Sequence, residues 1–303
     1  MDTDSRPAAS RRGALRLRIR PKRPIDGAVT GEFLSVFKGR GSEFEELREY
    51  TPGDDVRTID WKVTARAGRP FVRQYIEERE LTVIVAVDLS ASLRTGSGAL
   101  NKDAMARMAA ASIMYATIGN NDRAGLLLFS DRVDSWTRPK KGKGHAVFLE
   151  ERLRRARPEG RGTDLRGALI RLGIVAKRRS LLFILSDFLA PDYERPLRAL
   201  ALRHDVIPIV FRDPLDDTLP AAGLVAIRDL ETGKERLVDF SDPRVRTQYE
   251  AAGLRRLEER WRVFTTLGLK PLEIAGGADP VQALIQYFMR RAGVDAGRAA
   301  ASA

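Results

Sequence analysis

The stretch that most constrains the fold of this chain is LTVIVAVDLSAS, which runs from Leu81 to Ser92. Its first seven residues are all apolar or β-branched, and a run this short and this rich in Val and Ile is typical of a fully buried strand in a parallel sheet. The run ends on Asp88, and two hydroxyls follow at Ser90 and Ser92. Ligands of open α/β sheets bind outside the carboxyl ends of the strands, and clustered hard oxygens there suit a small hard cation such as Mg2+.

The rest of the chain supplies neighbours for this strand. Helix-length segments separate the apolar runs, and one of them, 102–119, is apolar on nearly every face, as a buried helix would be. Strands that alternate with helices predict βαβ connectivity and an α/β fold with a doubly wound, mostly parallel sheet. Pro208 indicates an edge position or a strand start. The further predicted strands are 124–129, 133–137 (an edge strand), 180–185 and 204–211.

A second carboxylate follows a strand in the same way as Asp88. Asp187 comes after the apolar run 180–185, separated from it by one serine. A helix is expected to begin at about Asp164, because apolar residues recur with helical spacing after that point. Thr163 stands just before this helix, where it could cap the helix. It could instead contribute a hydroxyl to the same sheet edge.

Composition excludes several classes of chemistry. The chain has no Cys, which excludes disulfides, thiolate catalysis and Cys-based zinc sites, and its two histidines are His145 and His204. The net charge of +12 indicates acidic partners, such as nucleic acid, an anionic membrane face or an acidic protein surface, or else a solvated arginine-rich surface. Apolar runs of about 18 residues and a signal-peptide h-region are both lacking, so the cytoplasm is the expected location.

The regions that flank the sheet are expected to be simpler. Residues 1–12 form a basic tail, and we expect this tail and residues 292–303 to be disordered. Residues 13–80 form an N-terminal extension, in which the capping-box spacing of Ser42 and Glu45 predicts a short helix through Tyr50.

After the sheet, residues 223–240 read as a hairpin. Two helices follow, at 243–261 and 280–291, which we expect to cover the sheet, the first with Leu254 and Trp261 on its apolar side. These elements complete a main domain spanning 81–291.

Residues 39–73 read GRGSEFEELREYTPGDDVRTIDWKVTARAGRPFVR. This long stretch closely resembles the signature of a bacterial family known as domain of unknown function number fifty-eight, often encoded beside MoxR-type AAA+ ATPases. The resemblance covers about 37–240. In that family the signature precedes a von Willebrand factor A-like domain, so the resemblance implies a Rossmann-like, doubly wound fold and a MoxR-type ATPase as partner.

The strand-end residues also resemble the metal-ion-dependent adhesion site of von Willebrand factor A domains. The resemblance implies that Ser90 and Ser92 bind Mg2+ (or Mn2+ or Ca2+) directly, that Asp88 and Asp187 hold coordinated waters, and that Thr163 binds directly or through water. An ion with few anionic ligands keeps much of its Lewis acidity and favours a carboxylate from a partner protein. The function implied is a non-enzymatic, Mg2+-dependent interaction module or adaptor in assembly or activation of a protein complex.

Two other functions stay open at this point. A metal-dependent phosphatase could use Asp88 as nucleophile, although haloacid dehalogenase-like enzymes need an aspartate where this chain has Ser90; no serine-hydrolase elbow is present. Nucleic acid could bind the basic segments 16–23 and 140–157. However, Phe148 is the one aromatic available there for stacking, and we expect it to be buried, together with Val147, on the apolar side of a helix.

Overall fold

The computed structural model describes residues 45–75, 80–97, 100–158, 160, 162–228 and 234–291. Contacts divide the chain into two compact units, one of residues 24–80 and the other of residues 1–23 with 81–303. The disorder expected for 1–12 and 292–303 concerns segments outside the described residues. None of the helices in the described ranges is both long enough and apolar enough to cross a membrane.

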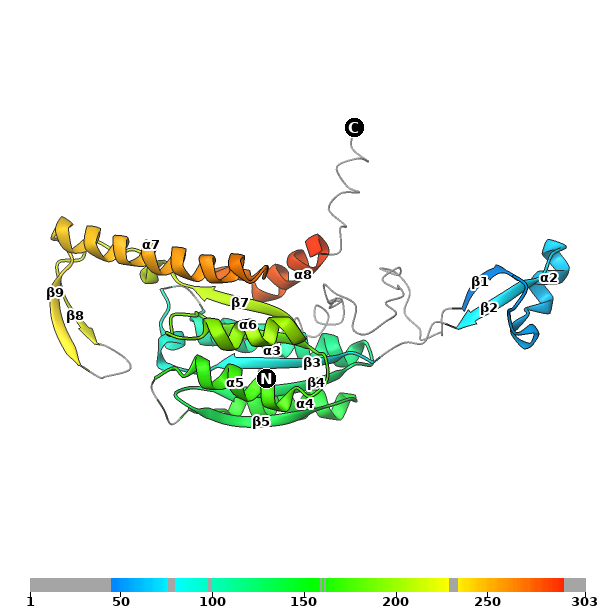
Figure 1. Ribbon diagram of the computed structural model, residues 1–303. Coiled ribbons are helices and arrows are strands. Elements are labelled where there is room, and N and C mark those ends of the chain that lie inside the picture. The colour runs from blue at the N-terminus through cyan, green and yellow to red at the C-terminus, as the bar shows by residue number, and fades with distance from the viewer. Residues whose placement is uncertain are drawn as a thin grey trace, which may run out of the picture. The chain divides into compact units, whose positions relative to one another are not determined.

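A six-stranded sheet forms the centre of the larger unit, in the order β10-β7-β6-β3-β4-β5. Figure 1 labels β7, β3, β4 and β5 of this sheet. All neighbours pair in parallel except β5, which runs antiparallel to β4 at one edge. The buried strand expected within Leu81–Ser92 is therefore β3, near the middle of the sheet. The strands are β3 (Thr82–Asp88), β4 (Arg123–Phe129), β5 (Val133–Lys140), β6 (Leu181–Ser186), β7 (Asp205–Arg212) and β10 (Leu272–Ala275).

Helices cover both faces of this sheet. Alternate side chains of a strand point to opposite faces, and those of β3 divide in this way: Val85 belongs to the core that includes α3, α4 and α8, whereas Ile84 belongs to the core that includes α5, α6 and the end of α7. The predicted α/β fold with a doubly wound, mostly parallel sheet is confirmed. The helices are α3 (Lys102–Gly119), α4 (Lys143–Arg155), α5 (Leu165–Val175), α6 (Glu194–Arg203), α7 (Pro243–Thr266) and α8 (Pro280–Arg291).

Proline residues occur in two strands of the sheet. Pro208 lies inside β7, between β6 and β10, so the expectation of an edge strand or strand start is wrong. The proline is tolerated because β10 pairs with β7 only from Ile209 onward, which leaves one side of the strand unpaired at Pro208. In the edge strand β5, the ring of Pro139 fills the space beside Gly125, where the pairing of β4 with β5 shifts its register.

The C-terminal part agrees only partly with the predictions. The hairpin is confirmed as β8 (Leu224–Arg228) paired with β9 (Glu235–Asp239), and most of its predicted turn lies outside the described residues. Helix α8 covers the sheet as expected, with Leu284 and Phe288 in the core. On α7 the predicted apolar side is wrong at two positions, because Leu254 is 58% and Trp261 is 39% exposed. Helix α7 packs into the core through Phe264, and it also packs through Gly253 against Asp216 and Asp217 and through the buried Arg260.

The smaller unit contains β1 (Glu45–Glu49), the 3-10 turn η1 (Val56–Thr58), α2 (Trp61–Ala67) and β2 (Phe71–Tyr75). The helix predicted through Tyr50 is wrong, because residues 45–49 form a strand that pairs antiparallel with β2. Pairing with a distant strand has overridden the local capping signal. Arg48 contacts the carboxylate of Asp54 at 2.6 and 2.7 Å, and this hydrogen-bonded pair holds the pKa of Asp54 well below its usual range.

Candidate metal centre

The candidate site lies where β3 and β6 end side by side. From β3 the chain passes through α3 to β4 on one side, and from β6 it passes through α6 to β7 on the other side. Such a reversal of direction opens a crevice outside the carboxyl ends of the two strands. Asp88 is the last residue of β3, and Asp187 directly follows β6. The fold thus brings both predicted carboxylates to the same sheet edge.

Asp88 is fully buried and held from two sides. Its Oδ1 accepts a hydrogen bond from the backbone N–H of Ser90 at 2.9 Å, and its Oδ2 accepts one from the hydroxyl of Ser186 at 2.7 Å. The strand register explains the second bond, because Val87 lies opposite Leu185 and the next pair brings Asp88 beside Ser186. Burial and then the negative charge of Asp187 raise the pKa of Asp88 to about 7. A positive charge placed near this carboxylate would stabilise its ionised form.

The two predicted hydroxyl ligands lie next to each other. The Oγ atoms of Ser90 and Ser92 are 3.0 Å apart, close enough for one ion to contact both. Ser90 is buried, and Ser92 is partly exposed within the 3-10 turn η2 (Ala91–Arg94). The hydroxyl of Thr95 donates to the backbone carbonyl of Ser92 at 2.7 Å, which fixes the end of this turn. The tight turn therefore presents both hydroxyls directly beyond β3.

Thr163 reaches the same edge by another route. Asp164 caps α5, with its side chain accepting from the N–H of Gly167 at 2.8 Å, so the suggestion that Thr163 is the N-cap is wrong. The backbone N–H of Asp164 donates to the carbonyl of Ser130 at 2.7 Å. Ser130 directly follows β4, whose last residue pairs with Asp88. The segment that carries Thr163 is thereby tied to the carboxyl edge of the strand beside β3.

Asp187 has a buried cationic partner that the sequence did not reveal. The Nζ atom of Lys102, the first residue of α3, lies 3.4 Å from Oδ2 of Asp187. The same Nζ donates to both carboxylate oxygens of Asp216, at 2.9 and 3.0 Å. Ser186 and Asp216 were not among the predicted ligands either. Two features of the sequence could have indicated Lys102 and Ser186: Lys102 begins an otherwise apolar helix, and Ser186 directly precedes Asp187 at a strand end.

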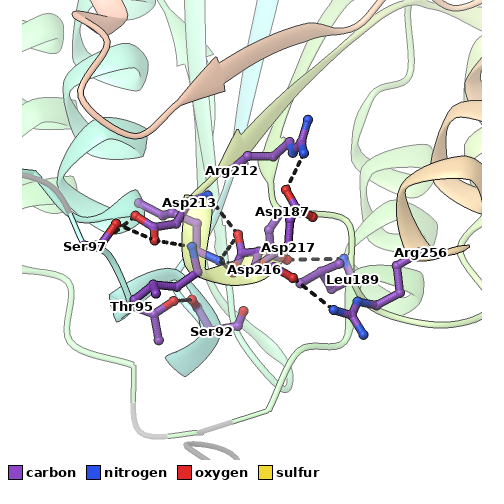
Figure 2. Close-up of polar contacts among 12 residues, drawn as sticks. Ser92, Thr95, Ser97, Asp187, Leu189, Arg212, Asp213, Asp216, Asp217 and Arg256 are labelled. Carbon is purple, nitrogen blue, oxygen red and sulfur yellow. Dashed lines mark hydrogen bonds and ion pairs between the residues drawn. The ribbon is translucent and has the colours of Figure 1, made fainter. Parts of the chain in front are cut away.

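The loop after β7 is joined to the loop after β3. Asp213 caps the 3-10 turn η3 (Pro214–Asp216) and accepts hydrogen bonds from the backbone N–H and hydroxyl of Ser97, at 2.8 and 2.9 Å (Figure 2). Ser97 follows η2, the turn that holds Ser92. The two loops thus support each other beside the predicted ligands.

The donors at this edge fit a hard divalent cation. The five predicted ligands offer only oxygen atoms, three from hydroxyls and two from carboxylates, and Mg2+ takes about six oxygen ligands while usually keeping several waters. In the part of the chain that the structure describes, no group of three or more His, Cys, Asp or Glu side chains could hold a metal ion. An ion at this edge would therefore depend on hydroxyls and water, with the carboxylates orienting those waters.

The same geometry disfavours the phosphatase hypothesis. A nucleophilic carboxylate must present an oxygen to the substrate. Asp88 has no exposed surface, and each of its carboxylate oxygens already accepts a hydrogen bond. Attack by Asp88 would require these bonds to break and the site to open.

Helix α4 differs from its prediction. Val147 and Phe148, expected to be buried, are 58% and 49% exposed, because the buried face of the helix instead carries Ala146, Leu149 and Leu153. The ring of Phe148 is flanked by His145, with a centroid distance of 6.1 Å, and by the guanidinium of Arg152 at 5.9 Å.

Comparisons with known proteins place the chain in a family. Uncharacterized proteins of Mycobacterium tuberculosis and Mycobacterium bovis are each 36% identical to it over 286 residues, covering 93% of this chain and 90% of theirs. Among solved structures, the conserved hypothetical protein BatB from Bacteroides thetaiotaomicron is similar, with a TM-score of 0.47 and 14% identity over 70% of this chain and 99% of that one. The SpRpn10 VWA domain has a TM-score of 0.40 and 8% identity, over 68% of this chain and 94% of that one. The model of the family described as "Protein of unknown function DUF58" matches residues 46–259, and the chain belongs to this family.

Proposed function

We propose that this protein is a non-enzymatic interaction module that binds a partner protein through a divalent cation. The observation that carries the proposal is the edge where β3 and β6 end, with the Ser90 and Ser92 hydroxyls 3.0 Å apart beside two buried carboxylates. Mg2+ suits such a set of hard oxygens, with Mn2+ or Ca2+ as alternatives.

Each residue has a distinct role in the proposed site. The hydroxyls of Ser90 and Ser92 bind the ion directly, and Thr163 binds directly or through water. Asp88 and Asp187 hold coordinated waters; Asp88 suits this role because its oxygens already accept hydrogen bonds from Ser90 and Ser186. Bound in this way, the ion supplies an electrophilic position for an oxygen ligand. An acidic residue of the partner would complete its coordination.

The partner that we propose is a MoxR-type AAA+ ATPase, in the cytoplasm. This choice is supported by the resemblance of residues 39–73 to a family often encoded beside such ATPases. The module would act as an adaptor when the ATPase assembles or activates a protein complex. The chemistry predicts that the contact depends on a carboxylate exposed on the surface of the ATPase.

The experiment combines metal binding with partner binding. Mg2+ is titrated by calorimetry into the full chain, into Ser92→Ala, and into the control Ser112→Ala. The hydroxyl of Ser112 donates to the Met108 carbonyl of its own helix at 2.9 Å, away from the candidate site. The association of each form with the MoxR-type ATPase of the same genome is then measured by biolayer interferometry, in Mg2+ and in EDTA.

We expect Ser92→Ala to weaken Mg2+ binding by about ten-fold or more, since it removes one direct ligand. Ser112→Ala should behave like the wild type. Association with the ATPase should be lost in EDTA and in Ser92→Ala. Partner binding that is equal in Mg2+ and EDTA would contradict the metal bridge, and a wild-type chain that binds no divalent cation would contradict the site itself.

A further inference from the structure

Lys102 is the least expected residue near the site. Its side chain is 1% exposed, and its ammonium reaches Asp187 at 3.4 Å and Asp216 at 2.9 Å. Taking an ammonium out of water is costly unless paired charges and hydrogen bonds compensate. Lys102 meets this requirement by contacting one carboxylate of the candidate metal site and one carboxylate outside it.

Its place in the helix adds a second cost. Lys102 is the first residue of α3, and the amino end of a helix carries a partial positive charge that disfavours a cation. The ammonium is compensated by its contacts with the carboxylates of Asp187 and Asp216, which favour its charged form. A positive charge is thus held beside the site although two features of its position oppose it.

This charge affects any ion bound at the sheet edge. A divalent cation whose water ligands are oriented by Asp187 would lie near the Lys102 ammonium, and like charges repel strongly where little water screens them. Asp216 opposes this effect, because it shares the ammonium with Asp187 and neutralises part of its charge. The two residues should therefore change metal affinity in opposite directions.

We propose that Lys102 is a built-in counter-cation that weakens the binding of a divalent cation to this site, and that Asp216 limits how far it does so. The inference rests on the proposed metal site and adds its regulation. A site weakened in this way fills well only when a partner carboxylate contributes to the coordination. Lys102 would thereby couple the retention of the metal to the presence of the partner.

The test measures Mg2+ binding to the full chain by calorimetry, with thermal unfolding in EDTA as a check on folding. Lys102→Met removes the charge while keeping much of the side-chain volume. In Asp216→Asn, Lys102 keeps its contact with the Asp187 carboxylate but loses the negative charge of Asp216. Asp103→Asn is the matched control, because Asp103 belongs to the same helix but pairs with Arg107 at 2.8 Å.

We expect Lys102→Met to bind Mg2+ about ten-fold more tightly than the wild type and Asp216→Asn to bind it several-fold more weakly. Asp103→Asn should stay within about two-fold of the wild type. If Lys102 and Asp216 only hold Asp187 in place, Lys102→Met and Asp216→Asn should both weaken Mg2+ binding, because both would disturb Asp187. The opposite signs therefore distinguish the two explanations.

Lys102→Met leaves the buried carboxylate of Asp187 and the partly exposed carboxylate of Asp216 without their cation, and the variant could fail to fold. The double variant Lys102→Met/Asp216→Asn removes one charge of each sign, and it should bind Mg2+ more tightly than Asp216→Asn alone. Equal or weaker binding in the double variant, or in Lys102→Met, overturns the inference while leaving the metal site intact. A wild-type chain that binds no Mg2+ overturns the proposed function, and the inference with it.

Discussion

His204 offers a direct test of the energetics of this fold, independent of the metal site. It follows α6, is 4% exposed, and neither of its ring nitrogens has a hydrogen-bond partner within the described residues. A buried polar group without a partner costs about 1–3 kcal/mol. His204→Leu removes both nitrogens and retains most of the buried volume. It should therefore raise the free energy of unfolding by about 1 kcal/mol or more near neutral pH.

The stability that His204→Leu gains over the wild type should grow as the pH falls. Burial, with a smaller effect of Arg203 and Arg179, lowers the pKa of His204 below its usual value of 6.5. The unfolded chain then takes up a proton before the folded chain does, so the wild type loses stability as the pH falls through 6.5, until the folded pKa is passed. Each unit of lowering adds about 1.4 kcal/mol to the difference between variant and wild type in acid.

Urea unfolding followed by circular dichroism at about pH 8 and about pH 5 measures this difference. The control is His145→Leu, which removes the other histidine and loses the 2.9 Å contact between Nε2 of His145 and the Ala124 carbonyl. The control should not be stabilised. A stability difference between His204→Leu and the wild type that is the same at both pH values would refute the reasoning.

Two further predictions concern the core and the chemistry. Phe183→Ala in the fully buried strand β6 should lower the free energy of unfolding by about 3–5 kcal/mol; Phe148→Ala, at a half-exposed position, should cost under about 1 kcal/mol in the same urea assay. If both cost the same, the assignment of faces on α4 is wrong. With p-nitrophenyl phosphate and Mg2+ the chain should show no turnover above buffer, and activity that Asp88→Asn abolishes would instead support a phosphatase.

The sheet could be predicted because its strands carry their own signal. The apolar runs that became β3, β4 and β6 are too short for helices and end at polar residues, so their type and direction follow from local sequence. The positions of Asp88 and Asp187 at one edge then follow from parallel connectivity alone. For this part of the fold, the local pattern and the tertiary structure agree.

The missed features depend on contacts between distant parts of the chain. Lys102 meets Asp187 and Asp216 across 85 and 114 residues, and no local pattern records such an encounter. Residues 45–49 carried a helical capping signal, but β2 pairs with them and satisfies their backbone in a strand. Helix α4 buries Ala146, Leu149 and Leu153, which recur with helical spacing, whereas Val147 and Phe148 lie outside that spacing.

The edge strand β5 restricts how other proteins can approach. Pro139 and Lys140 lie at its end, and the register shift in its pairing with β4 distorts the ladder there. The opposite edge strand, β10, has only four residues. Short strands, bulges, prolines and lysines at sheet edges discourage an incoming chain from extending the sheet. Within the described sheet, neither border is a good template for β-augmentation, so recognition by side chains is favoured over recognition by shared backbone hydrogen bonds.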